Sequence, residues 1–143
     1  DWSQYFDAIY CLHYSGYHDR KPVIDAELDR VGILNSGVFQ YLYTARTPLD
    51  FKIRDMMKPD YPDFYNERAE KVTCLNLAYY MLWNEALQAG HKRILTLEDD
   101  IEITRNLGYL KQHLDALPND WDYLHFDKVM NKRENGRLST LIP

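Results

Sequence analysis

Cysteine is scarce in this chain of 143 residues, and the usual signs of export or membrane insertion are missing. The two cysteines, Cys11 and Cys74, lie in separate apolar segments and form no metal-like cluster. Because disulfides are rare in reducing compartments, buried free thiols are the favoured interpretation. No apolar run approaches the roughly 18 residues of a membrane span, and no secretory signal is visible. We therefore expect a cytoplasmic location and no membrane span.

The charged residues are of mixed sign along the chain, and several well-known catalytic motifs are absent from the sequence. The net charge is -5, with acids and bases interspersed, so no basic stripe indicates a nucleic-acid partner. The sequence contains no G-x-S-x-G elbow, no P-loop, no G-x-G-x-x-G and no pair of histidines at helical ligand spacing. These absences argue against a serine hydrolase, a P-loop nucleotide site and a helical zinc site.

The residues that are present predict a single α/β domain over residues 1–143. Hydrophobic residues make up 45% of the chain, which is enough for a real core. Short apolar runs predict strands at residues 7–14, 38–44, 93–97 and 121–126. Helical spacing predicts a helix from Pro22 to about Gly32 and a long helix over 67–89 that Gly90 ends. It also predicts a helix over 103–117 with Thr104 as N-cap, and a short one within 49–57. Strands that alternate with helices indicate a mostly parallel sheet. In the long helix, the expected core-facing stripe is Val72, Leu75, Tyr79, Leu82 and Ala86.

The segment RILTLEDDIEI, residues 93–103, places three consecutive acids directly after a buried-looking strand. Ligands of open α/β sheets bind beyond the carboxyl ends of the strands, so Glu98, Asp99 and Asp100 fall at the binding edge. Side chains alternate along an extended chain, which predicts that Glu98 and Asp100 point to one side and Asp99 to the other. Two carboxylates on one side would suit Mg²⁺ or Mn²⁺. The alternative is a solvated acidic turn, since most charge runs are solvated.

Three segments in order resemble glycosyltransferase family 25, the lipopolysaccharide and capsule glycosyltransferases related to collagen galactosyltransferases. ILTLEDDIEI, preceded by a helix and AGHKR, is similar to the Leu-Glu-Asp-Asp core motif of that family. AIYCLHYSGYHDR is similar to its opening strand, with Asp19 and Arg20 matching the closing pair of the motif. LPNDWDYLHF resembles its later Trp-Asp segment. The resemblance spans roughly residues 7–127.

The resemblance implies a GT-A-like fold, a Rossmann-type three-layer sandwich that binds a nucleotide sugar. It implies that Glu98, Asp99 and Asp100 hold Mn²⁺ or Mg²⁺ on the donor diphosphate, with Glu98 and Asp100 the catalytic pair. The metal would neutralise charge on the departing nucleotide diphosphate. Arg20 is expected to reach the donor, with a surface arginine as the equal alternative. The other expected donor-binding residues are those at the end of the first strand and in the following loop: Leu12, His13 and Asp19.

The family pattern is not followed everywhere. The family usually has Asn-Leu where this chain has His13 and Tyr14, an arginine at Tyr17, and Leu-Ser-His where the long helix reads Leu77-Ala78-Tyr79. Family members also continue well beyond the Trp-Asp strand. Three interpretations of the chain therefore stay open: a truncated domain, a minimal member of the family and an inactive relative.

The leading hypothesis is a metal-assisted glycosyltransferase, moving a sugar from a nucleotide donor, most simply a UDP-sugar, to a glycan or lipid-linked saccharide. The first alternative is a non-catalytic module of the same fold that binds a nucleotide sugar or a glycan. A nucleotidyltransferase is weaker, because the loop after the first strand contains Gly16 as its single glycine. Asp127, just after the last expected strand, is a candidate for an acceptor-side role or for a second metal site.

Overall fold

The computed structural model describes residues 1–44, 67–103, 107–118 and 120–124. Within these ranges the strands are β1 (Ala8–Tyr14), β2 (Phe39–Thr44) and β3 (Ile94–Glu98). The helices are α1 (Arg20–Arg30), α4 (Glu67–Gln88) and α5 (Leu107–Ala116), and a 3-10 helix, η1 (Trp2–Gln4), precedes β1. The mixed α/β class predicted from the sequence is confirmed.

The three strands form one parallel sheet in the order β2-β1-β3. Ile9 of β1 lies opposite Phe39 of β2 and Leu95 of β3. The central position of β1 explains its composition, because a parallel strand covered on both faces reads as a continuous apolar run. The first six residues of β1 are indeed buried.

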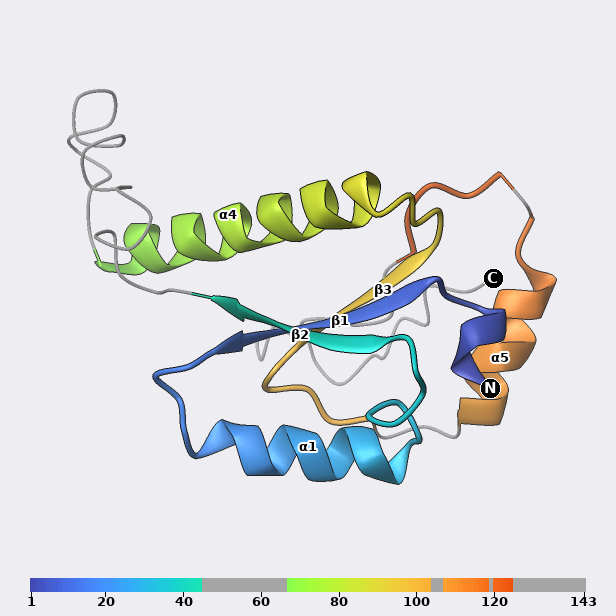
Figure 1. Cartoon of the computed structure of the whole chain (residues 1–143), viewed down its shortest axis with the longest axis horizontal. Coiled ribbons are helices and arrows are strands. Elements are labelled where there is room, and N and C mark those ends of the chain that lie inside the picture. The colour runs from blue at the N-terminus through green and yellow to red at the C-terminus, as the bar shows by residue number, and fades with distance from the viewer. Residues whose placement is uncertain (45–66, 104–106, 119, 125–143) are drawn as a thin grey trace, which may run out of the picture.

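Helices cover both faces of the sheet because the chain changes direction across it. The path runs from β1 through α1 to β2 on one side, and then returns through α4 to β3 on the other side of β1. Parallel crossovers are almost always right-handed, so two crossovers in opposite directions place their helices on opposite faces. Figure 1 shows α4 above the sheet and α1 below it. The carboxyl ends of β1 and β3 therefore flank a topological switch point, where open α/β sheets bind ligands.

Alternating side chains of β1 divide the core into two clusters. Ile9 and Cys11 pack on the α1 face with Ile24 and Leu28, and η1 and α5 extend this cluster at one end of the molecule (Figure 1). On the α4 face, the core consists of Ala8, Tyr10, Leu12, Ala78, Leu82 and Ala86. Burial raises the pKa of the Cys11 thiol to about 12, so this thiol stays protonated at neutral pH.

The core-facing stripe of α4 differs from the predicted one. Leu82 and Ala86 are buried and Tyr79 is half-buried, as predicted, but Val72 is 51% exposed and Leu75 is 38% exposed. The buried row is instead Cys74, Ala78, Leu82 and Ala86, at intervals of four residues. Three of its members are small, and small side chains allow a helix to approach a sheet closely. The prediction was wrong for Val72 and Leu75, because the side of the helix that faces the sheet carries small side chains there instead.

Glycines with positive φ end both crossover helices. Gly32 (φ 69°) follows α1, and the amide of Ile33 donates to the carbonyl of Leu28 at 2.8 Å. Gly90 (φ 76°) follows α4, and the amide of His91 donates to the carbonyl of Ala86 at 3.0 Å. Both are Schellman motifs, which favour glycine because side chains are strained in the left-handed region. The helix ends predicted at Gly32 and Gly90 are confirmed.

The later part of the chain differs from the prediction. Residues 121–124, expected to begin a fourth strand, have no regular secondary structure. The helix expected over 103–117 is present as α5, Leu107–Ala116. The predicted N-cap Thr104, the helix proposed within 49–57, and residues 125–126 of the expected strand lie outside the described residues. Among the residues that the structure describes, no helix is long and apolar enough to cross a membrane.

Asp7 joins the starts of β1 and β3, and we expect it to make stability depend on pH. Its Oδ2 accepts the backbone N–H groups of Lys92 (2.7 Å) and Arg93 (2.9 Å), which lower the pKa of Asp7, with Arg93 contributing most. A carboxyl whose pKa is lowered in the folded state stabilises above its unfolded pKa of about 3.9. This stabilisation is lost as the pH falls through the folded value.

Asp7→Asn should therefore reduce the free energy of unfolding by a few tenths to about 1 kcal/mol at pH 7, after allowance for solvent screening. The difference from wild type should shrink by pH 3. Urea midpoints at both pH values would measure it, with Asp122→Asn, at an exposed site, as the control. A constant difference at both pH values would contradict the assignment.

Candidate functional site

A buried histidine–aspartate pair lies at the switch point between β1 and β3. The register places Leu12 opposite Glu98, so the next residues, His13 and Asp99, lie at the carboxyl ends of adjacent strands. Nδ1 of His13 is 2.7 Å from Oδ2 of Asp99, and the two side chains are 3% and 9% exposed. The Tyr41 and Tyr43 rings make T-shaped contacts with the imidazole, with ring centroids 6.0 and 5.9 Å from its own. The pair joins the first strand to the acidic motif.

Arg20, the first residue of α1, bridges two of the three acids. Its Nη1 donates to Oδ1 of Asp99 at 2.9 Å and to Oδ2 of Asp100 at 3.3 Å. The guanidinium also lies over the Tyr17 ring, 4.2 Å from its centroid. The hydrogen bond to Asp99 is the main reason that the pKa of Arg20 is raised. Both carboxylate oxygens of Asp99 are thus engaged, one by His13 and one by Arg20.

Glu98 is held from the opposite face of the sheet. The hydroxyl of Tyr79, on α4, donates to Oε1 of Glu98 at 2.8 Å. Burial and the neighbouring Glu98 carboxylate raise the pKa of Tyr79, so Tyr79 remains a hydrogen-bond donor through the physiological range. Sequence reasoning assigned Tyr79 to core packing and missed this contact. No local sequence signal separates this tyrosine from a core residue, because the contact with Glu98 depends on how α4 packs on the sheet.

Tyr79→Phe should lower the free energy of unfolding by about 1 kcal/mol, because a hydroxyl–carboxylate bond is lost at a half-buried position. The neighbouring Tyr80 is 60% exposed on the same helix. Tyr80→Phe is therefore a matched control and should change stability by less than about 0.5 kcal/mol. Chemical denaturation of both variants measures the difference, and equal effects would show that the Tyr79 hydroxyl contributes nothing specific.

The side chains of the three acids do not follow the simple alternation that the sequence predicts. Glu98 ends β3 and bonds to α4, whereas Asp99 and Asp100 follow the strand and share Arg20 from α1. Strict alternation holds only while the chain stays extended, and residues 99–100 form a turn. Glu98 and Asp100 are thus held by donors from different helices instead of forming a simple pair.

A second polar cluster lies beside His13 on the α1 face. Asp25 accepts hydrogen bonds from Nζ of Lys21 at 2.6 and 2.7 Å and from the hydroxyl of Tyr41 at 2.6 Å. Burial pushes the pKa of Asp25 up, but these hydrogen bonds outweigh it and the pKa is lowered. The Asp25 carboxylate is therefore ionised, and it orients Tyr41 against the imidazole of His13.

The other residues predicted for the site are placed as follows. Leu12 is 4% exposed within the α4-facing core, so its side chain does not reach the edge of the sheet. Asp19 is exposed at the N-cap position of α1 and makes no capping hydrogen bond through its side chain. Asp127 lies outside the described residues. Of the residues predicted, the structure therefore joins His13, Arg20, Asp99 and Asp100 directly, with Glu98 next to them in the chain.

The carboxylate oxygens of the motif meet part of the requirement for binding a divalent cation. Hydrogen bonds among the described residues use one oxygen of Glu98 and one of Asp100, leaving the second oxygen of each. Over the described part of the chain, no three His, Cys, Asp or Glu side chains form a group that could hold a metal ion. Mg²⁺ is often held by one or two carboxylates together with substrate phosphates and waters. Glu98 and Asp100 are therefore the described residues of the motif that could contribute oxygen ligands to such a cation.

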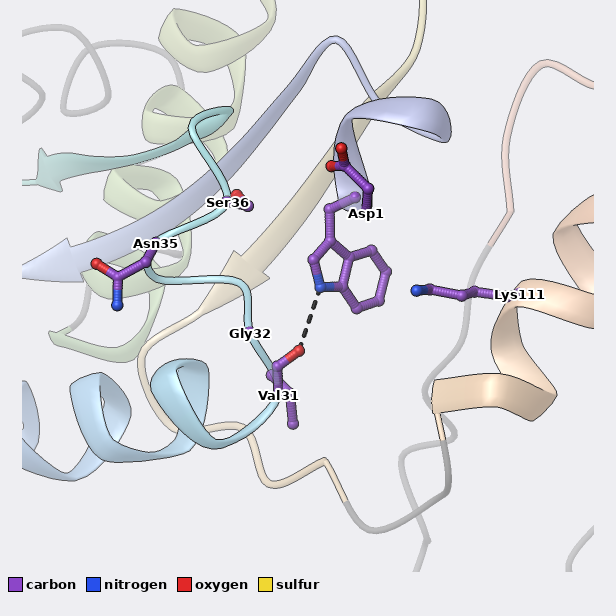
Figure 2. A pocket seen from close by; sticks show the side chains of 7 residues that line it. Asp1, Val31, Gly32, Asn35, Ser36 and Lys111 are labelled. Carbon is purple, nitrogen blue, oxygen red and sulfur yellow. Dashed lines mark hydrogen bonds between the residues drawn. The ribbon is translucent and has the colours of Figure 1, made fainter.

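A separate pocket of about 440 Å³, drawn in Figure 2, is lined by none of the acidic residues 98–100. Its lining comes from the segment before β1, the loop between α1 and β2, and α5: Asp1, Trp2, Val31, Gly32, Asn35, Ser36 and Lys111. The first two of these segments lead into β1 and β2, so the pocket lies toward the amino edge of the sheet. The indole of Trp2 already donates to the carbonyl of Val31 at 3.2 Å. We place the functional site at the carboxyl edge, where the charged groups converge.

Comparison with known proteins gives no relative for this chain. No protein-family model, no curated protein and no solved structure matches it. Functional inference therefore rests on the residues of the site and on the resemblance of the motifs.

Proposed function

We propose that the chain is a glycosyltransferase with a GT-A-like fold, similar to glycosyltransferase family 25. It would move a sugar from a nucleotide-sugar donor, most simply a UDP-sugar, to a glycan or to a lipopolysaccharide or capsule acceptor. The observation that supports this most strongly is the contact of Arg20 and His13 with Asp99 at the switch point. Two motifs that the resemblance assigns to the donor site are 79 residues apart in sequence and meet there.

Arg20 is the natural partner for the donor diphosphate in this proposal. An arginine presents its N–H groups in a planar fork that matches phosphate oxygens. Arg20 lies at the first turn of α1, where helix N–H groups and the helix dipole also favour an anion. Its side chain is 32% exposed, so it is accessible from the edge of the sheet.

Glu98 and Asp100 would hold a divalent cation, Mn²⁺ or Mg²⁺, on that diphosphate. When bound, the cation would neutralise the negative charge on the departing nucleoside diphosphate. Asp99, with both oxygens engaged and 9% exposure, is better suited to positioning Arg20 than to binding the metal. We also propose that the reaction takes place in the cytoplasm, since Cys11 is a buried thiol and disulfides are rare in that compartment.

The second candidate is a binding module that holds a nucleotide sugar without turning it over. The observation that favours it is that all three acids already have donors within the protein. Both candidates predict donor binding, and only the enzyme predicts release of the nucleoside diphosphate.

Calorimetric titration of UDP, with and without Mn²⁺, tests the shared part of both candidates. Mn²⁺-dependent binding is expected. UDP release from a panel of UDP-sugars with saccharide acceptors then separates the enzyme from the module. Absence of binding by UDP and by other nucleoside diphosphates, with Mn²⁺ present, would refute both.

A further inference from the structure

Arg20 makes two contacts of unequal quality with the acidic motif. The contact with Asp99 is short, at 2.9 Å, and the carboxylate is 9% exposed. The contact with Asp100 is longer, at 3.3 Å, and that carboxylate is 56% exposed. Because solvent screens the second ion pair more strongly, it is the easier of the two to exchange.

The rest of the surroundings hold Arg20 where it is. Asp99 is fixed by His13 through a 2.7 Å hydrogen bond, and His13 is 3% exposed and packs against the Tyr41 and Tyr43 rings. Tyr17 supports the guanidinium from one side at 4.2 Å. Arg20 can therefore change its outer partner while it keeps the inner one.

We propose that Arg20 is a resident counter-cation of the acidic motif, and that a diphosphate takes the place of Asp100 as its outer partner. In the resting protein, the positive charge of Arg20 on Asp100 disfavours a divalent cation at that carboxylate. When a diphosphate binds Arg20, Asp100 becomes available as an oxygen ligand. Cation binding and diphosphate binding are thereby linked through one side chain. This inference rests on the proposed function and specifies how its donor site is loaded.

The inference predicts that one substitution changes the affinities for two ligands, each measured separately, in opposite directions. Arg20→Gln should bind Mn²⁺ alone about tenfold more tightly than wild type, because a positive charge next to the carboxylates is removed. The same variant should bind inorganic pyrophosphate, measured with EDTA and without metal, about tenfold more weakly. Electron paramagnetic resonance of free Mn²⁺ and calorimetry give the two affinities. A residue with a merely structural role would weaken both ligands or neither.

Two further variants complete the design. Arg30→Gln removes the same charge from the other end of α1, where Arg30 pairs with Glu27 at 2.7 Å, and should change neither affinity by more than about twofold. Arg20→Lys keeps the charge and should leave the affinity for Mn²⁺ close to that of wild type. It should bind pyrophosphate more weakly, because the planar fork of the guanidinium is lost. This variant therefore provides the test if Arg20→Gln does not fold.

The outcomes distinguish this inference from the proposed function. Unchanged affinities in Arg20→Gln, or a loss of both, would overturn the role of Arg20 even if wild type binds UDP with Mn²⁺. Failure of wild type to bind any nucleoside diphosphate with Mn²⁺, while the opposite shifts persist, would overturn the proposed function and leave the linkage through Arg20 standing. Failure of wild type to bind pyrophosphate would overturn the inference directly.

Discussion

Asp99→Ala is expected to lower the free energy of unfolding by about 3 kcal/mol, although the residue lies next to the exposed Asp100. Removing Asp99 leaves the imidazole of His13 without its 2.7 Å partner at a position that is 3% exposed. It also removes the shorter of the two ion pairs of Arg20. Desolvated polar groups without partners are among the few causes of single-site losses this large. The urea midpoint should fall by about 1–2 M.

Asp100→Ala is the matched control for this stability effect. It removes the same chemical group one position later, at a site 56% exposed, where the ion pair with Arg20 should contribute less than about 1 kcal/mol. Similar losses in the two variants would show that burial of the His13–Asp99 pair does not matter to the fold. A negligible loss in Asp99→Ala would lead to the same conclusion.

Asp100→Ala is expected instead to remove metal-dependent donor binding, with turnover reduced by at least about 100-fold. Asp100 is the most exposed acid that Arg20 contacts, and one of its oxygens lies outside the hydrogen bonds of the described residues. The variant should keep a near-native melting temperature, so the loss can be assigned to the site. Calorimetry with UDP and Mn²⁺, followed by UDP-release assays, measures both quantities.

Glu102→Ala provides the control for charge. It removes one negative charge two residues further along the chain, at an exposed position. UDP affinity in the presence of Mn²⁺ should stay within about twofold of wild type, since exposed charges at a distance are screened. Undiminished turnover in Asp100→Ala would contradict the assignment of Asp100 to the donor site.

The parallel strands and helices were predictable wherever local signals and tertiary environment agree. β1 reads as a buried strand because it is central and covered on both faces. Gly32 and Gly90 mark helix ends because their positive φ values favour glycine. Residues 121–124 have strand-like composition but no strand, because pairing also depends on a neighbouring edge that composition does not reveal.

The site was predictable to the level of its acids and its edge of the sheet, but not to the level of their partners. Parallel topology alone places the motif after β3 at the carboxyl edge. The choice of partners depends on tertiary distances: Tyr79 meets Glu98 across the α4 packing, and Arg20 meets Asp99 across the switch point. His13 and Arg20 were found only through the resemblance of the first-strand motif. Nothing local in the sequence marks Tyr79 as a partner of Glu98 rather than as a core residue.

The most direct test of the central claim is the location of the nucleotide site by paramagnetic NMR. Mn²⁺ added with UDP should broaden amide signals of residues 12–20 and 98–101, and Mg²⁺ with UDP should shift the same signals without broadening them. The pocket lined by Trp2, Ser36 and Lys111 should be unaffected, since it lies toward the amino edge of the sheet. Broadening centred on residues 31–36 and 111, with residues 98–101 unchanged, would contradict a donor site at the switch point.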